Sequence, residues 1–194
     1  NFKFLRDLKS EGSFKARSFA RSLIDEWIEQ DINLRSKVFD SEIMAERVSC
    51  WCFNYSWFGE SGDLNFQKKV LTSIALQTKF LELKLEETQK PNNQIIIIKG
   101  LLVAKSILYK DINNIHAMLD IVSDAVDLLI NPDGGHKSRS PVKQLLLLRQ
   151  LVEIRSIVAV LKNIDAEYLH NQTIKMGEFC RSFQMPDENF AWFN

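Results

Sequence analysis

Polar side chains that could contact a ligand are concentrated in one glycine-rich stretch. Residues 131–140 read Asn-Pro-Asp-Gly-Gly-His-Lys-Ser-Arg-Ser, so His136 and Arg139 follow two adjacent glycines. A guanidinium can bind a carboxylate with two parallel hydrogen bonds, and an imidazole can donate or accept one. Structural roles remain open, because His136 can hydrogen-bond the loop and Arg139 can satisfy a helix end. Asp133 before two glycines is also typical of a tight turn.

Two uncharged amides near the middle of the chain are further candidates. Asn92 and Asn93 could donate hydrogen bonds to an acidic ligand, or could cap the helix that we expect to begin here. Lys143 can accept a proton only where burial removes its charge. The other histidines, His116 and His170, lie within helical patterns, so we expect them to be solvated or satisfied within the fold.

The elements that position these groups are predicted to be helices. The 194 residues include only 7 Gly and 4 Pro, whereas folds built from β-strands use both in frequent tight turns. Apolar residues recur at steps of three and four, which is the spacing of an amphipathic helix. We therefore expect an all-α protein of antiparallel helical hairpins in a single domain over residues 1–194. The predicted helices begin near Ser13, Asp40, Leu64, Pro91, Asn114, Ser140 and Asp165.

Some of these helices carry more specific predictions. The run Ile95 to Ile98 could form a strand by its β-branching, but the apolar pattern continues past Gly100 and favours a helix. The aromatic group at residues 51–58 is expected in the core. The first long helix is predicted to bury one apolar face, which consists of Phe19, Leu23, Ile24, Trp27 and Ile28.

Composition excludes several function classes. Lys+Arg and Asp+Glu both number 25, and this balance argues against a general nucleic-acid binder or an anionic membrane surface as partner. Cys50, Cys52 and Cys180 do not have metal-binding spacing, so we expect unpaired, buried thiols and no cofactor or metal. No stretch approaches the roughly 20 apolar residues of a transmembrane helix. Because the chain starts at Asn1 rather than Met, we expect it to be a piece of a longer protein.

Two segments resemble a known family of carbohydrate-active proteins. Residues 91–104 read Pro-Asn-Asn-Gln-Ile-Ile-Ile-Ile-Lys-Gly-Leu-Leu-Val-Ala, and residues 130–141 contain Asp-Gly-Gly-His followed by Arg-Ser-Pro. They are similar to the Asn-Asn-His and Asp-Gly-Gly-His…Arg-Ser-Pro patterns of the heparinase II/III-like polysaccharide lyases. Residues 4–8 and 190–194 are similar to the flanks of that family.

The resemblance implies a fold, a partner domain and a compartment. It implies that the helical hairpins form part of an incomplete (α/α) toroid, which a C-terminal β-sandwich domain, absent from this chain, would complete. The implied ligand is an acidic polysaccharide or oligosaccharide that contains uronic acid. The family suggests the periplasm or cell envelope, with the cytoplasm as an alternative.

The resemblance also implies roles in a β-elimination reaction. Such lyases remove the proton beside the uronate carboxylate, so a neutral donor must stabilise the developing charge and a nearby group must accept the proton. The implied catalytic residues are Asn93, His136 and Lys143. Lys143 stands where the family has Tyr, and Gln144 stands where the family has the next His. The implied substrate-binding residues are Asn92, Gln94, Asp133, Ser138 and Arg139.

These differences from the family leave other functions open. Gln94 stands where the family has His and cannot exchange a proton at neutral pH. The alternative to a lyase is a non-catalytic protein that binds acidic glycans, or a scaffold, on the same fold. A third class is a helical-repeat interaction module, which would present an apolar groove rather than a polar cleft.

Overall fold

The computed structural model describes residues 2–30, 37–109, 114–161, 164–185 and 187, and within them every long element is a helix. The all-α fold class is therefore confirmed. A short 3-10 turn, η1, spans Lys37–Phe39, and the described part contains no β-strand. The α-helices are α1 (Leu5–Glu11), α2 (Phe14–Glu29), α3 (Ser41–Phe58), α4 (Leu64–Glu87), α5 (Pro91–Leu108), α6 (Ile115–Leu129), α7 (Pro141–Val158) and α8 (Glu167–Arg181).

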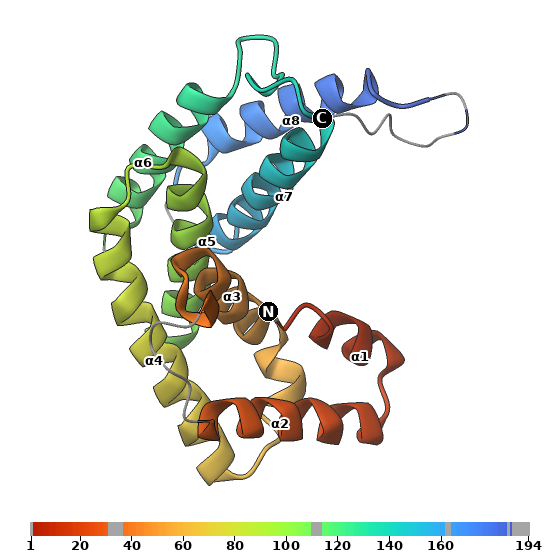
Figure 1. The fold of residues 1–194 in the computed structure, drawn as a ribbon, viewed down its shortest axis with the longest axis vertical. Helices are drawn as coiled ribbons and strands as arrows, with labels where there is room; N and C mark the ends of the chain where they lie inside the picture. The colour runs from red at the N-terminus through yellow and green to blue at the C-terminus, as the bar shows by residue number, and fades with distance from the viewer. Residues whose placement is uncertain (1, 31–36, 110–113, 162–163, 186, 188–194) are drawn as a thin grey trace. The chain divides into compact units, whose positions relative to one another are not determined.

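The contacts divide the chain into two compact units that share helix α5. Unit 1 comprises residues 1–88 and 100–112, and unit 2 comprises residues 89–99 and 113–194. Unit 1 contains α1 to α4 and the second half of α5, whereas unit 2 contains the first half of α5 and α6 to α8 (Figure 1).

Unit 1 is organised around the antiparallel hairpin of α3 and α4. Near one end Phe58 packs against Phe66, with ring centroids 6.3 Å apart, and further along Arg47 Nε donates to Gln77 Oε1 at 2.8 Å. The two helices therefore run antiparallel, as predicted for a helical hairpin.

An aromatic core stabilises the same unit. Trp27, Trp51 and Phe2 meet edge to face, with ring centroids 5.2 to 6.2 Å apart. The guanidinium of Arg47 lies 4.2 Å above the Trp27 ring, and burial lowers the pKa of Arg47 to about 10. Trp51 and Phe58 are fully buried, which confirms their predicted core role.

Unit 2 contains a second antiparallel hairpin, formed by α7 and α8. Arg155 Nη1 donates to Thr173 Oγ1 at 2.9 Å across this pair. The Tyr168 hydroxyl donates to Asp127 Oδ1 at 2.7 Å and so connects α8 to α6. From α5, the buried ammonium of Lys99 pairs with Glu153 of α7 at 2.9 Å. Polar contacts of these three kinds therefore connect all four helices of the unit.

Two of the predicted helix starts are confirmed by capping hydrogen bonds. The hydroxyls of Ser13 and Ser140 accept N–H bonds from the first turns of α2 and α7. Asp40 precedes α3 as predicted, but its carboxylate makes no capping bond. Helix α5 begins at Pro91, so Asn92 and Asn93 lie within its first turn and the predicted cap role is wrong for both.

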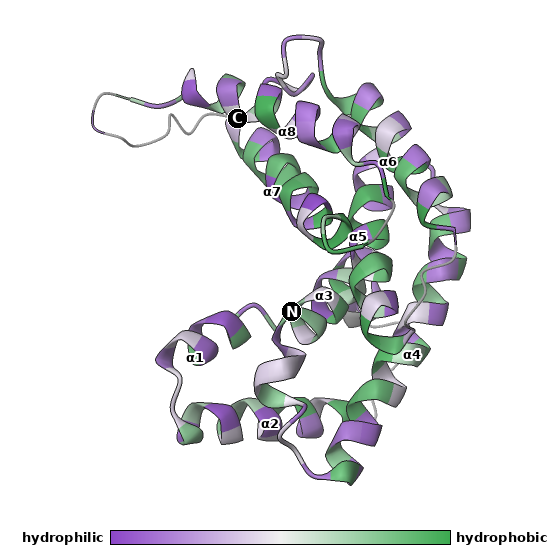
Figure 2. Cartoon of the chain, turned by 180° about the vertical axis from the view of Figure 1, so that it is seen from behind, coloured by the Kyte–Doolittle hydropathy of each residue, from purple (hydrophilic) through white to green (hydrophobic). Residues whose placement is uncertain are grey.

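The buried faces of two helices differ in how well the sequence predicted them. Helix α5 is apolar along most of its length (Figure 2), and Ile95, Ile97 and Ile98 are fully buried, which confirms a helix rather than a strand. In α2, however, the buried positions include Ala20 and Ile24, while Phe19 is 55 % exposed. The prediction that Phe19 belongs to the core is wrong, because a face containing small side chains makes the contact instead.

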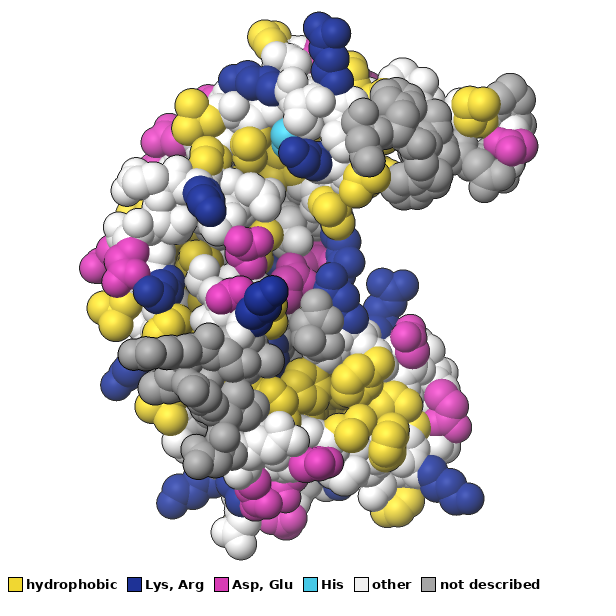
Figure 3. All heavy atoms as spheres, in the orientation of Figure 1, with side chains coloured by type: hydrophobic (Ala, Val, Ile, Leu, Met, Phe, Trp, Pro, Cys, Tyr) yellow, Lys and Arg dark blue, Asp and Glu magenta, His cyan; other side chains and the backbone are white. Residues whose placement is uncertain are grey.

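Neither the charge on one face nor the length of the described helices points to a partner of one charge or to a membrane span. On the face drawn in Figure 3, Lys and Arg side chains lie among Asp and Glu side chains rather than in a field of one sign. Within the described ranges, we find no helix that combines the length and the apolar character needed to cross a lipid bilayer.

Two glycines within helices give a matched test of packing. A Cβ at Gly100 would lie 3.1 Å from the backbone of Ala45, whereas a Cβ at Gly177 would meet nothing within 4 Å. Alanine improves helix propensity at both sites by about 1 kcal/mol, but overpacking against the α3 backbone costs about 1 to 3 kcal/mol. We expect Gly177→Ala to raise and Gly100→Ala to lower the free energy of unfolding, as measured by urea denaturation. Stabilisation by both substitutions would contradict the close approach of α5 to α3.

Candidate functional site

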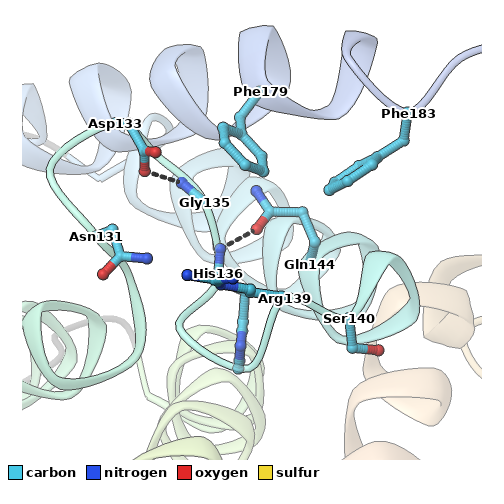
Figure 4. Close-up of a pocket in the computed structure, with 9 residues that line it drawn as sticks. All are labelled: Asn131, Asp133, Gly135, His136, Arg139, Ser140, Gln144, Phe179 and Phe183. Carbon is cyan, nitrogen blue, oxygen red and sulfur yellow. Dashed lines mark hydrogen bonds between the residues drawn. The ribbon is translucent and has the colours of Figure 1, made fainter. Parts of the chain in front are cut away.

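The loop between α6 and α7 is held by its own backbone and by one carboxylate. Asn131 donates its N–H to the Gly135 carbonyl at 2.8 Å, and Gly134 donates to the Asn131 carbonyl at 2.9 Å. Asp133 Oδ1 accepts the N–H of Gly135 at 2.9 Å (Figure 4). The predicted turn role of Asp133 is therefore confirmed, and at least one of its oxygens is engaged within the loop.

The two glycines let this loop approach α8 closely. Gly134 has φ +86°, and a Cβ there would lie 2.6 Å from the Lys175 carbonyl oxygen. A Cβ at Gly135 would lie 2.5 Å from the ring of Phe179. A side chain at position 134 would meet the backbone of α8, and one at position 135 would displace the Phe179 ring, so the two glycines permit this close approach.

A single buried side chain connects the loop to both helices of the hairpin. Gln144, in the first turns of α7, is completely buried. Its Oε1 accepts the N–H of His136 at 2.6 Å, and its Nε2 donates to the carbonyls of Gly134 at 2.9 Å and Met176 at 3.3 Å. The carboxamide thereby satisfies two backbone groups of the loop and adds a bond to a carbonyl that lies within α8.

The ring of His136 has a defined tautomer. Its Nδ1 accepts the backbone N–H of Ser138 at 3.0 Å, and the Ser138 hydroxyl lies 2.8 Å from the same atom. A backbone N–H can only donate, so Nδ1 carries a lone pair and the proton of the neutral ring resides on Nε2. None of the described residues accepts a hydrogen bond from that Nε2.

The surroundings also keep His136 neutral. Partial burial lowers its pKa below the ordinary value of 6.5, and the positive charge of Lys143 lowers it further. At neutral pH the ring is therefore an uncharged donor at Nε2 rather than a cation.

Arg139 adopts a backbone conformation that is unusual for a residue with a side chain. Its φ is 56°, in the left-handed region, which costs a non-glycine residue roughly 1 to 2 kcal/mol. Its N–H donates to the His136 carbonyl at 2.8 Å, and its side chain is exposed. Backbone strain of this kind is concentrated at binding sites.

These residues surround a pocket of about 440 Å³ within unit 2 (Figure 4). The loop and α7 provide one wall, and Phe179 of α8 and Phe183, just after that helix, provide another. The two rings meet edge to face with centroids 5.3 Å apart. The pocket therefore combines an aromatic wall, a guanidinium and a neutral imidazole. Its lining residues are Asn131, Asp133, Gly135, His136, Arg139, Ser140, Gln144, Phe179 and Phe183.

The structure brings together part of the predicted site. Asp133, His136 and Arg139 line the pocket, and Ser138 orients His136 without lining it. Lys143 is exposed, so it lacks the burial that a proton acceptor would need. Three predicted residues lie in the first turn of α5 and are not among those lining the pocket, namely Asn92, Asn93 and Gln94. The flank at residues 190–194 lies outside the described residues.

Sequence reasoning missed several lining residues. Gln144 entered only as the replacement for a family histidine, although a glutamine among leucines in α7 is a signal for a buried polar partner. Phe179 and Phe183 follow Met176 at helical spacing, a pattern that is equally typical of core residues. Only the folded hairpin places their rings beside a loop more than 40 positions earlier.

The described residues give no support to a metal site or to a reactive thiol. In the ranges with assigned structure, no group of three or more His, Cys, Asp or Glu side chains is placed to hold a metal ion. Cys50, Cys52 and Cys180 are all free, and burial raises the pKa of the Cys52 and Cys180 thiols. Cys50 is only half-buried, in contrast to the prediction.

Comparisons of this chain with protein-family models, with curated proteins and with solved structures found no match.

The role of Gln144 can be tested by removing its carboxamide. Gln144→Ala leaves the His136 N–H and the Gly134 carbonyl without the partner that the carboxamide provides, and each such group costs about 1 to 3 kcal/mol when buried. We expect the free energy of unfolding to fall by about 2 to 4 kcal/mol in chemical denaturation. The control is Lys143→Ala, at the exposed neighbouring position, which should change it by less than about 0.5 kcal/mol. Equal losses of unfolding free energy in Gln144→Ala and Lys143→Ala would contradict the structural role of Gln144.

The electrostatic coupling of His136 can be measured by NMR titration of its ring protons. We expect a pKa below 6.5 in the folded protein, and a higher value in Lys143→Ala because one repelling charge is gone. Lys137→Ala removes the same charge from the loop itself and should leave the pKa nearly unchanged. Since the unfolded chain binds the proton more readily, stability should fall as pH decreases below 6.5 and level off below the folded-state pKa. An ordinary pKa in the wild type would contradict the burial of the ring and the repulsion by Lys143.

Proposed function

We propose that this chain is the helical part of a heparinase II/III-like protein, and that its pocket binds the carboxylate of an acidic glycan. The observation that carries the proposal is Arg139, which lines the pocket beside His136 with its backbone in the left-handed region. The likeness of residues 91–104 and 130–141 to the family supports it. In this proposal the antiparallel hairpins belong to an incomplete (α/α) toroid, and a C-terminal β-sandwich domain completes the cleft.

The chemistry of the pocket suits a sugar acid. The guanidinium of Arg139 can bind both carboxylate oxygens, and the His136 Nε2–H can add a third hydrogen bond. The rings of Phe179 and Phe183 offer an apolar surface against which a sugar ring can pack. Because His136 stays neutral, Arg139 provides the positive charge among the residues that line the pocket.

Binding without turnover is the form of this function that the pocket supports best. Elimination needs a group that accepts the proton beside the carboxylate. The Nδ1 lone pair of His136 is occupied by Ser138, its Nε2 carries a proton, and the exposed Lys143 lacks the burial that a lysine base needs. The second candidate is the lyase reaction itself, favoured by Asn93 and the Asp133-to-Pro141 motif. In that case the proton acceptor would come from the proposed β-sandwich domain.

The binding proposal is tested by calorimetry with the full chain. We expect a uronate oligosaccharide to bind and a neutral oligosaccharide of equal length to bind far more weakly. Arg139→Ala should weaken uronate binding at least tenfold, because a charge-assisted hydrogen bond contributes about 1.5 to 3 kcal/mol. The control is Lys137→Ala, which removes an equal charge from the same loop, where Lys137 Nζ donates instead to the Asp127 carbonyl. Equal weakening of uronate binding by both substitutions would indicate a general effect of charge and would contradict a specific contact with Arg139.

A parallel assay of the longer protein, with the proposed β-sandwich domain present, separates the two candidate functions. Elimination creates a double bond in the product, so ultraviolet absorbance would rise during incubation with uronate glycans. Binding that depends on Arg139 without such a rise supports the non-catalytic form. A rise that disappears in His136→Ala would favour the lyase.

A further inference from the structure

Two arginines of α2 converge on one exposed hydroxyl in unit 1, remote in sequence from the glycan pocket. Arg21 Nη2 donates to the Ser61 Oγ at 2.7 Å, and Arg17 Nη1 lies 3.5 Å from the same oxygen. The two arginines are one helical turn apart and half-buried, while Ser61 is exposed in the loop between α3 and α4. Two cations thus face a neutral group from one side.

The loop that presents Ser61 is held firmly. Arg21 Nε donates to the Phe58 carbonyl at 2.7 Å. Gln67 Nε2 donates to the carbonyls of Glu60 at 3.1 Å and Gly62 at 2.8 Å, on either side of Ser61. The hydroxyl and one guanidinium are therefore fixed in place in the free protein, which reduces the entropy that a ligand would lose on binding.

Neither guanidinium has a carboxylate within ion-pair distance in the described part of unit 1. The nearby Asp63 is engaged elsewhere, since its Oδ1 accepts the N–H groups of Asn65 and Phe66 at the start of α4. The Phe66 N–H is the main reason that the pKa of Asp63 is lowered, and the charge of Arg21 adds to it. Two positive charges therefore remain without a direct counter-charge.

Hydrogen-bonding capacity is left over as well. A guanidinium has five N–H donors, yet Arg17 makes a single long bond and its Nε is buried without a partner in the described structure. Arg21 directs two donors, to Phe58 and Ser61. Because Ser61 Oγ accepts from the arginines, its own hydrogen remains free to donate.

From this geometry we propose that Arg17, Arg21 and Ser61 form a binding site for a tetrahedral phosphate dianion, either free or as a monoester. A phosphate monoester has three terminal oxygens and can offer a separate one to each guanidinium and to the hydroxyl, whereas a carboxylate has only two. Two negative charges also match the two cations. The proposal does not rest on the glycan function, because its residues all belong to unit 1.

The test titrates inorganic phosphate into the full chain at constant ionic strength, with calorimetry and phosphorus NMR line widths as readouts. We expect saturable binding, weakened about tenfold in Arg17→Ala through loss of a charge-assisted contact. Ser61→Ala should weaken it less. Arg21 also donates to the Phe58 carbonyl, so the variant at this position is Arg21→Lys rather than Arg21→Ala. Circular dichroism checks that this variant is folded. The control is Lys15→Ala, which removes an exposed charge from the same helix.

Each outcome decides the proposal. No saturable binding of phosphate, or equal weakening in Lys15→Ala and Arg17→Ala, would overturn it. Acetate competing as well as phosphate would overturn the tetrahedral class. A second arm with glycerol phosphate identifies the source: tighter binding of the ester indicates a phosphorylated ligand, and tighter binding of inorganic phosphate indicates the free ion. Arg139→Ala should leave all of these results unchanged, so the two sites can fail separately.

Discussion

The hydrogen bonds of one buried carboxamide hold the candidate site together. Gln144 binds the backbone of the α6–α7 loop on both sides of Gly135 and the backbone of α8 at Met176. Water cannot replace these contacts readily at a position with no exposed surface, so the loop, α7 and α8 are fixed as one structure. The left-handed backbone at Arg139 can persist because its surroundings are constrained in this way.

The polar groups of the loop divide into those that build it and those that face the pocket. Asp133, Ser138 and Gln144 are occupied by backbone N–H groups or by the His136 ring. Among the described residues that line the pocket, the Arg139 guanidinium and the Nε2 of His136 are donors that the framework leaves available. This division explains how a segment with a turn-like composition can also present a site, because the same bonds that close the turn orient the free donors.

The sequence predicted the elements well and the site only in part. Helix starts at Ser13 and Ser140 and the Asp133 turn depend on local hydrogen bonds, which spacing along the chain reveals. Spacing does not reveal which face of a helix its neighbours cover. The prediction of a buried Phe19 is wrong for this reason, since the face of α2 that packs inward contains alanines. The aromatic wall of the pocket depends on how α8 returns along α7, and that contact leaves no local pattern in the sequence.

Helix α5 belongs to both compact units, and the boundary between them falls at Lys99 and Gly100, in the middle of a continuous helix. Boundaries between independent domains usually lie in exposed linkers, where the chain can be cut without loss of structure. Here any truncation that separates the units would break a helix whose residues on both sides are buried. One helix therefore contributes buried residues to two cores, and melting of α5 would remove packing from each of them.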